Sequence, residues 1–152
     1  MIGLKDREEP VVMTMLERKK REALFIKAND HTAEAINAAL EQVFANFREH
    51  TFEIFKTITA DNGSEFAELS QFENGQLKVY FTHPYSSFEK GTNERHNRML
   101  RRFIQKGKSI ADYSSEDLSF FADRIYSLPR KILGYSTPDE LFEKELDIIY
   151  AR

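Results

Sequence analysis

The order of strand-like and helix-like segments constrains the fold of this chain more than any other feature. Two short β-rich runs come first and flank the charged cluster from Glu17 to Lys20, which is typical of a hairpin. Strand-like and helical periods then alternate. The predicted strands are 11–16, 21–28, 52–60 and 77–81, and the predicted helices are 31–47, 64–72, 88–105, 115–128 and 137–146. This order predicts an α/β fold in which helices flank both sides of a mixed central sheet.

Length and composition bound the class of protein. The 152 residues fit one domain, and no repeat or linker divides them. No apolar run approaches the roughly 18 residues that cross a membrane, and the charged N-terminus lacks the apolar run of a secretory signal. The chain has no cysteine, which excludes disulfides and fits a reducing cytoplasm. We therefore expect one cytoplasmic domain with no membrane partner.

The charge distribution points to a basic stripe on an acidic domain. The net charge is −3, but residues 89–108 carry +5, which leaves −8 for the rest of the chain. A stripe of this kind can dock on a phosphate backbone without making the whole protein adhere to nucleic acid. The charge distribution alone is equally consistent with residues 89–108 forming a helix face that is simply exposed to solvent.

Two acids are candidates for chemistry. Asp61 follows a predicted strand at the point where open α/β sheets carry functional side chains, although Asp61-Asn62-Gly63 is also good turn chemistry. Glu94 lies at the middle of a helical arc of amides and bases, with an apolar arc opposite that includes His96. That polar arc comprises Asn97, Arg98, Arg101, Arg102, Gln105 and Lys108. We interpret Glu94 as a metal ligand among phosphate-binding groups, and His96 as a packed histidine.

This pattern fits two-metal phosphoryl transfer. In such sites carboxylates from separate elements hold Mg²⁺ or Mn²⁺ ions about 3.5–4 Å apart. Asp61 and Glu94 are the predicted catalytic and metal-binding residues. The predicted DNA-binding residues are Lys90, Asn97, Arg98, Arg101 and Lys108.

Three motifs carry a resemblance to a known family. Residues 58–66 (ITADNGSEF) resemble the second-aspartate motif of retroviral integrases and related transposases. Residues 83–97 (HPYSSFEKGTNERHN) resemble the segment that carries their glutamate, and residues 128–138 (LPRKILGYSTP) resemble a C-terminal stretch. The resemblance is closest to the insertion-sequence-thirty family of bacterial DDE transposases.

The resemblance implies an RNase H-like catalytic core that cleaves and joins double-stranded DNA at transposon ends with Mg²⁺. Asp61 and Glu94 would be the second and third acids, and the protein would work in the bacterial cytoplasm as a homodimer or larger assembly. The first acid of the family precedes a pair similar to Ile2-Gly3. We therefore expect residues 1–152 to be an N-terminally truncated domain, with an incomplete first strand and little activity. The alternatives are a non-catalytic DNA-binding or multimerisation module and an RNase H-like nuclease.

Overall fold

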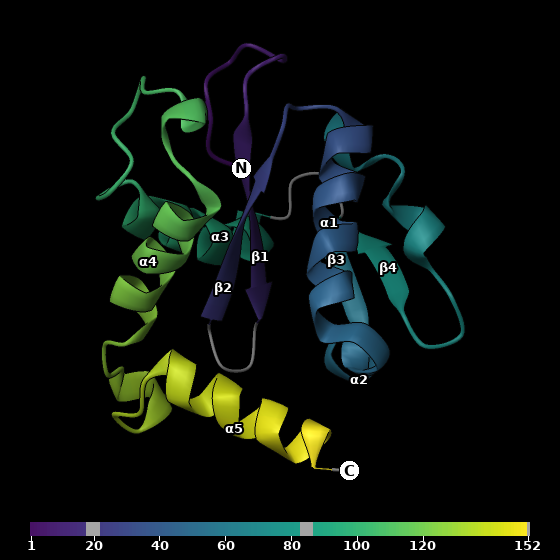
Figure 1. The fold of residues 1–152 in the computed structure, drawn as a ribbon, viewed down its shortest axis with the longest axis vertical. Helices are drawn as coiled ribbons and strands as arrows, with labels where there is room; N and C mark the ends of the chain where they lie inside the picture. Colours follow the sequence, from purple (N-terminus) through teal and green to yellow (C-terminus); the bar gives the residue numbers. More distant parts are fainter. Residues whose placement is uncertain (18–21, 83–86, 152) are drawn as a thin grey trace.

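The computed structural model describes residues 1–17, 22–82 and 87–151, and of residues 87–90, 92 and 93 only the backbone. Its strands form an antiparallel pair, β1 (Val11–Glu17) with β2 (Glu22–Ala28), and a parallel pair, β3 (Thr57–Ala60) with β4 (Lys78–Phe81). The helices are α1 (Ala33–Phe47), α2 (Thr51–Ile54), α3 (Ser87–Leu100), α4 (Ser115–Tyr126) and α5 (Pro138–Tyr150). Helices lie on both sides of the strands (Figure 1), so the predicted α/β class is confirmed.

The β1–β2 hairpin is covered on both faces. Val11 and Met13 pack in a cluster with Ile36 of α1, whereas Val12 packs in another with Leu118 of α4. Because successive side chains of a strand point to opposite faces, two helical layers bury the start of β1 completely. The two predicted strands are confirmed, and the turn predicted between them falls at residues 18–21, outside the described residues.

Helix α1 joins the two strand pairs on one side (Figure 1). It begins at Ala33, two residues after the predicted start, and the Thr32 hydroxyl caps it by accepting a hydrogen bond from the Ala35 amide at 3.2 Å. The cluster around its buried face includes Met13 from the hairpin and both Ala60 and Val79 from the parallel pair. This shared core is what holds β3 beside β1.

The predicted strand over residues 52–60 was partly wrong, because α2 replaces its first half. The Thr51 hydroxyl donates hydrogen bonds to the carbonyls of Phe44 and Arg48, at 2.8 and 2.6 Å, and ties α2 to the end of α1. Phe55 then packs against the Phe44 ring at 5.4 Å between centroids. Aromatic packing on one side of a helical turn produced the apolar alternation that indicated a strand.

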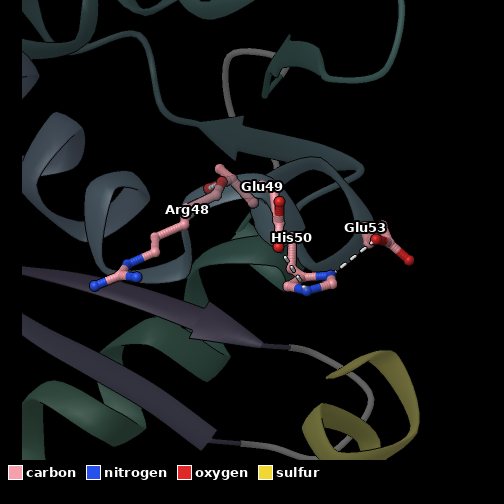
Figure 2. A network of polar contacts seen from close by, with 5 residues as sticks. Arg48, Glu49, His50 and Glu53 are labelled. Carbon is pink, nitrogen blue, oxygen red and sulfur yellow. Dashed lines mark hydrogen bonds and ion pairs between the residues drawn. The ribbon is translucent and has the colours of Figure 1, made fainter. Parts of the chain in front are cut away.

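A polar network fixes this corner against α5. The chain leaves α1 through Arg48, whose φ of 49° turns the backbone toward α2. Figure 2 shows the His50 ring directed at Glu53, with Nδ1 3.0 Å from Oε1, and Glu49 beside it. The same ring lies 4.4 Å from that of Tyr150 near the end of α5. The α1–α2 corner and the C-terminal helix therefore stabilise each other.

The helix that carries Glu94 ends earlier than predicted. Helix α3 stops at Leu100, and tight turns follow in which the Arg102 and Phe103 amides bond to carbonyls three residues back. These turns bring Ile104 into the same buried cluster as Leu100. Gln105 and Lys108 therefore do not continue the polar face of α3.

The last two helices confirm their predicted starts. Ser114 with Asp117 and Thr137 with Glu140 form capping boxes at α4 and α5. Helix α5 runs to Tyr150 rather than to residue 146.

His96 is 1% exposed. Its Nδ1 lies 2.6 Å from the Tyr126 hydroxyl, as expected of a packed histidine rather than a ligand.

Candidate active site

A groove separates the two strand pairs. Within the described residues β1–β2 and β3–β4 remain separate two-stranded sheets. The space between β1 and β3 has a volume of about 830 Å³. Apolar side chains from the α1 side line it, among them Leu40, Leu69 and Phe66, and so do polar side chains from α3 and the end of β3. This groove brings residues far apart in sequence to one place.

Asp61 borders the groove directly after β3. The carboxylate is exposed and accepts a hydrogen bond of 3.3 Å from the Gly63 amide, while Asn62 donates one of 2.7 Å to the Thr82 carbonyl. The Asp61-Asn62-Gly63 segment is therefore a turn tied to the end of β4, as its composition predicts. The turn leaves the Asp61 carboxylate at the groove, so the structural and functional interpretations of this segment are compatible.

Glu94 and Asn97 enter the same groove from α3. Glu94 is exposed, and Asn97, three residues further along the same helix face, is half-buried. The Asn97 side-chain oxygen accepts a hydrogen bond of 2.7 Å from the Thr14 hydroxyl of β1, which holds this face of α3 against the strand. The two acids predicted from sequence thus come from separate elements and line one groove.

The N-terminal amine of Met1 lies among three further charges at this site. Burial lowers the pKa of the amine, Asp61 and Glu65 raise it, and Arg101 lowers it, so each of these three groups is close enough to act on the amine. The Glu65 carboxylate packs over Gly63, where a Cβ would lie only 2.7 Å from it. Glycine at this position is what allows the close approach.

Of the remaining predicted DNA-binding residues, Arg98, Arg101 and Lys108 are not among the described residues that line the groove. Arg98 is exposed near the end of α3, and Lys108 is exposed beyond Gly107, whose φ is 87°. Arg101 is half-buried and close to the Met1 amine. The side chain of Lys90 lies outside the described part of the structure.

The carboxylates at the groove are of the kind that a hard cation binds. Mg²⁺ binds through one or two carboxylates and completes its shell with water and substrate phosphate. Asp61 and Glu94 on one groove fit that requirement. Among the described side chains no group of three or more acids or histidines is placed to hold a metal ion. None of the described helices has the length and apolar character needed to cross a membrane.

Comparisons with known proteins bear on the family and the fold. No family model matches the sequence. The chain is 40% identical over 143 residues, 94% of its length, to the probable transposase for insertion-like sequence element IS1161 of Streptococcus salivarius. It is 31% identical over 134 residues, 88% of its length, to transposase InsI for insertion sequence element IS30A of Escherichia coli K12. These matches span 40% and 34% of the two relatives, less than half of each.

The structural comparison defines the class of fold. The chain superposes on the catalytic core domain of BIV integrase with a TM-score of 0.52 at 16% sequence identity, covering 95% of this chain and 99% of that one. The fold is therefore that of an integrase catalytic core, which is RNase H-like, as predicted. In sequence, the chain is a homologue of the IS30-type bacterial transposases, and the predicted resemblance is confirmed.

Proposed function

We propose that this chain is the catalytic core of a DNA transposase that cleaves and joins DNA at transposon ends. The observation that carries the proposal is the convergence of Asp61 and Glu94, from β3 and α3, on one groove. Homology to the IS30-type transposases supports the same reaction class. The working location consistent with this role is the bacterial cytoplasm.

Asp61 and Glu94 would hold Mg²⁺ or Mn²⁺ through their carboxylates. A divalent ion bound there supplies activation of an attacking hydroxyl and stabilisation of the leaving oxygen. The exposure of both carboxylates leaves room for a phosphodiester to reach them. Asn97 sits between them and β1 and would orient the substrate backbone, since its amide nitrogen is a donor while its oxygen is occupied by Thr14.

The basic residues around the groove would position the DNA. Arg98 is exposed on α3, one turn after Glu94, and Arg101 and Asp61 both act on the charge of the Met1 amine. Lys90 and Lys108 extend the basic segment on either side in sequence. Each such contact adds counterion release and steepens the salt dependence of binding. The partners of the working protein would be transposon-end and target DNA, with a second copy of the chain.

Residues 1–152 alone would be a weak enzyme under this proposal. The chain spans 40% of the length of its S. salivarius relative. Six acids line its groove, but among the described side chains no group of three or more acids or histidines is placed to hold a metal ion.

Strand joining tests the proposal. A longer form of the protein, with residues upstream of Met1, would be incubated with Mn²⁺ and a nicked transposon-end duplex. We expect Asp61→Asn and Glu94→Gln each to reduce joining by at least about 100-fold. The matched control is Glu116→Gln, an exposed acid in the first turn of α4, which should leave joining unchanged.

Binding measurements on residues 1–152 separate the alternatives. If the acids are metal ligands, Asp61→Asn weakens Mn²⁺ binding and neither substitution weakens DNA binding. A longer form that is folded and binds DNA but never joins it, with metal affinity unchanged by both substitutions, would indicate a DNA-binding module. Preferential cleavage of RNA–DNA hybrids would indicate an RNase H-like nuclease.

A further inference from the structure

Tyr126, at the end of α4, contacts three separate parts of the molecule. The side chain is 1% exposed, and its ring centroid lies 5.9 Å from that of Phe25 on β2 and 5.7 Å from that of His96 on α3. The guanidinium carbon of Arg130, in the segment after α4, lies 5.4 Å from the centroid of the same ring. Tyr126 therefore connects the C-terminal motif at residues 128–138 to helix α3.

The Tyr126 hydroxyl is a hydrogen-bonded link between β2 and α3. Burial raises the pKa of Tyr126, so the hydroxyl keeps its proton, while the backbone amide of Ala23 hydrogen-bonds to its oxygen. The hydroxyl proton is then available to Nδ1 of His96, which lies 2.6 Å from the hydroxyl oxygen. His96 is also 1% exposed. Because both side chains are buried, removal of either group would leave the other without this partner in the core.

Polar contacts hold the middle of α3 from two sides. His96 is bonded to α4, and Asn97 accepts the hydrogen bond of 2.7 Å from the Thr14 hydroxyl of β1. Glu94 lies two residues before His96, about 200° around the helix, so it lines the groove while His96 enters the core. A side chain about 5–6 Å from the helix axis moves about 1 Å when the helix rotates by about 10°. Because a displacement of about 1 Å can cost about 100-fold in rate, the rotation of α3 has to be fixed.

The segment between α4 and α5 fixes the backbone of Arg130. The Arg130 amide donates a hydrogen bond of 3.1 Å to the Ser136 carbonyl, and its carbonyl accepts bonds of 2.9 and 3.0 Å from the Leu133 and Tyr135 amides. Gly134 and Tyr135 are both left-handed, with φ of 62° and 67°. A tyrosine in this conformation is uncommon and persists where the surrounding structure over-determines the turn. The Arg130 side chain therefore leaves the backbone from a fixed position.

The guanidinium of Arg130 is engaged within the protein. Arg130 is half-buried, whereas its neighbour Lys131 is exposed. The distance of 5.4 Å from the Tyr126 ring is within the range of cation–π attraction. Burial and neighbouring acids raise the pKa of Asp139 at the start of α5 to about 6, and the Arg130 charge opposes that rise. These contacts suit a packing role for Arg130 better than a role in binding DNA.

We propose that Arg130, Tyr126 and His96 are positioning residues that connect the C-terminal motif to α3 and set the rotation of α3 that directs Glu94 into the groove. None of the three is among the described residues that line the groove, so they act through α3 rather than on a substrate. The inference rests on the proposed function for the role of Glu94 as a metal ligand. The path of contacts from Arg130 to α3 does not depend on that role.

Distances between spin labels test the position of α3 directly. The chain has no cysteine, so Arg95→Cys on α3 and Glu41→Cys on α1, both at exposed positions, can carry the two labels. We expect Tyr126→Phe and His96→Leu each to shift or broaden the distance distribution. The double variant should add little to the larger single effect, because the two groups share one contact. Val79→Ala, which removes buried bulk from β4, is the destabilised control and should leave the distribution unchanged.

Mn²⁺ titration of residues 1–152 relates the position of α3 to the metal site. We expect Tyr126→Phe to weaken Mn²⁺ binding by about tenfold, and Arg130→Met to weaken it by less. Lys131→Met, at the exposed neighbouring position, is the matched control and should leave Mn²⁺ binding unchanged. In a longer form that joins DNA, Tyr126→Phe should lower kcat and leave KM unchanged, because Tyr126 does not touch the substrate.

Three results would overturn the proposal. The first is that folded Tyr126→Phe and His96→Leu variants keep the parent's distance distribution. The second is a shifted distribution with Mn²⁺ affinity that Glu94→Gln weakens but Tyr126→Phe does not. The third concerns Arg130: an Arg130→Met variant with unchanged distances, weaker DNA binding and a salt slope lower by about one would make it a phosphate contact.

Failure of the proposed function would look different. If Glu94→Gln leaves Mn²⁺ affinity unchanged while Tyr126→Phe shifts the label distances, the metal site fails and the positioning of α3 by Tyr126 is upheld.

Discussion

The two strand pairs differ in length and in how they are covered. The β1–β2 hairpin has seven residues in each strand, and Val11, Val12 and Met13 are at most 6% exposed. The β3–β4 pair has four residues in each strand, and Tyr80 is 55% exposed. Helices cover both faces of the hairpin, whereas the parallel pair shares the α1 core on one face.

The difference in burial suits the two strand pairs to different roles, one in stability and one in function. The start of β1, buried on both faces, has no side chain free to meet a substrate, but it gives a rigid wall beside which α3 can be positioned. A short strand covered on one face contributes less buried area and leaves the residues after it accessible. Asp61 follows such a strand. We infer that the hairpin holds the fold and that the end of the parallel pair is available for function.

Replacing one valine by alanine in each strand pair should give the largest difference in stability between the pairs. Val12 is 0% exposed and Val79 is 9% exposed, and each packs in a different core cluster. We expect Val12→Ala to lower the free energy of unfolding by about 2–3 kcal/mol and Val79→Ala by about 1–2 kcal/mol. Urea unfolding measures both. Equal losses would contradict the contrast between the pairs.

A half-buried acid at the turn end of the hairpin should make stability depend on pH. Burial raises the pKa of Glu22 to about 7, and four nearby carboxylates add to the effect. These are Asp139, Glu17, Glu143 and Asp123. One oxygen of Glu22 is buried with no hydrogen-bond partner among the described residues. The folded state therefore favours the protonated acid.

The sign of this dependence follows from linkage. Because the pKa of Glu22 is raised on folding, its stabilising contribution is fully present below its unfolded value of 4.5 and is lost as the pH rises through about 7. Solvent contact limits the loss to about 1–2 kcal/mol. Glu22→Gln should flatten stability between pH 4.5 and 8 and match the parent at pH 4. A slope that survives in Glu22→Gln would place the responsible group elsewhere.

Sequence patterns correctly predicted the helices and strands in which local propensity and tertiary packing favour the same structure. The hairpin strands, α1 and the capped starts of α4 and α5 have apolar periods that match their burial. The predictions were wrong where tertiary packing, rather than local sequence, determined the secondary structure. Phe52 and Phe55 lie in the segment predicted as a strand, but they are three residues apart and both pack on Phe44 of α1. Burial of Ile104 ends α3 in tight turns.

The candidate site was predictable in its acids but not in its surroundings. Asp61 and Glu94 stand in motifs with a strong local signature, and their elements converge on one groove. No local pattern places the Met1 amine beside Asp61 and Arg101, or the Glu65 carboxylate over Gly63. Those relations depend on how distant segments pack, which a single sequence does not encode in any short window.

The hydrogen bond between Thr14 and Asn97 links the hairpin to the helix that carries Glu94. Thr14→Val keeps the shape of the side chain and removes the donor at 2.7 Å from the Asn97 oxygen. We expect a loss of about 1 kcal/mol, because Asn97 is half-buried and loses a partner. Thr59→Val, on an exposed side chain of β3, is the matched control and should change stability by less than about 0.5 kcal/mol. Similar losses from both substitutions would argue against this link.

Asp61→Asn should have the smallest effect on stability of all. Asp61 is exposed, and its hydrogen bond of 3.3 Å from the Gly63 amide can be accepted equally by an asparagine oxygen. We expect the free energy of unfolding to change by less than about 0.5 kcal/mol. The substitution removes the charge that metal binding requires and leaves the turn intact, so urea unfolding and Mn²⁺ titration on the same sample give independent answers. A variant that loses stability as well as metal affinity would mean that the Asp61 carboxylate stabilises the turn. The contrast between a hairpin that holds the fold and a parallel pair whose end is available for function would then fail at Asp61.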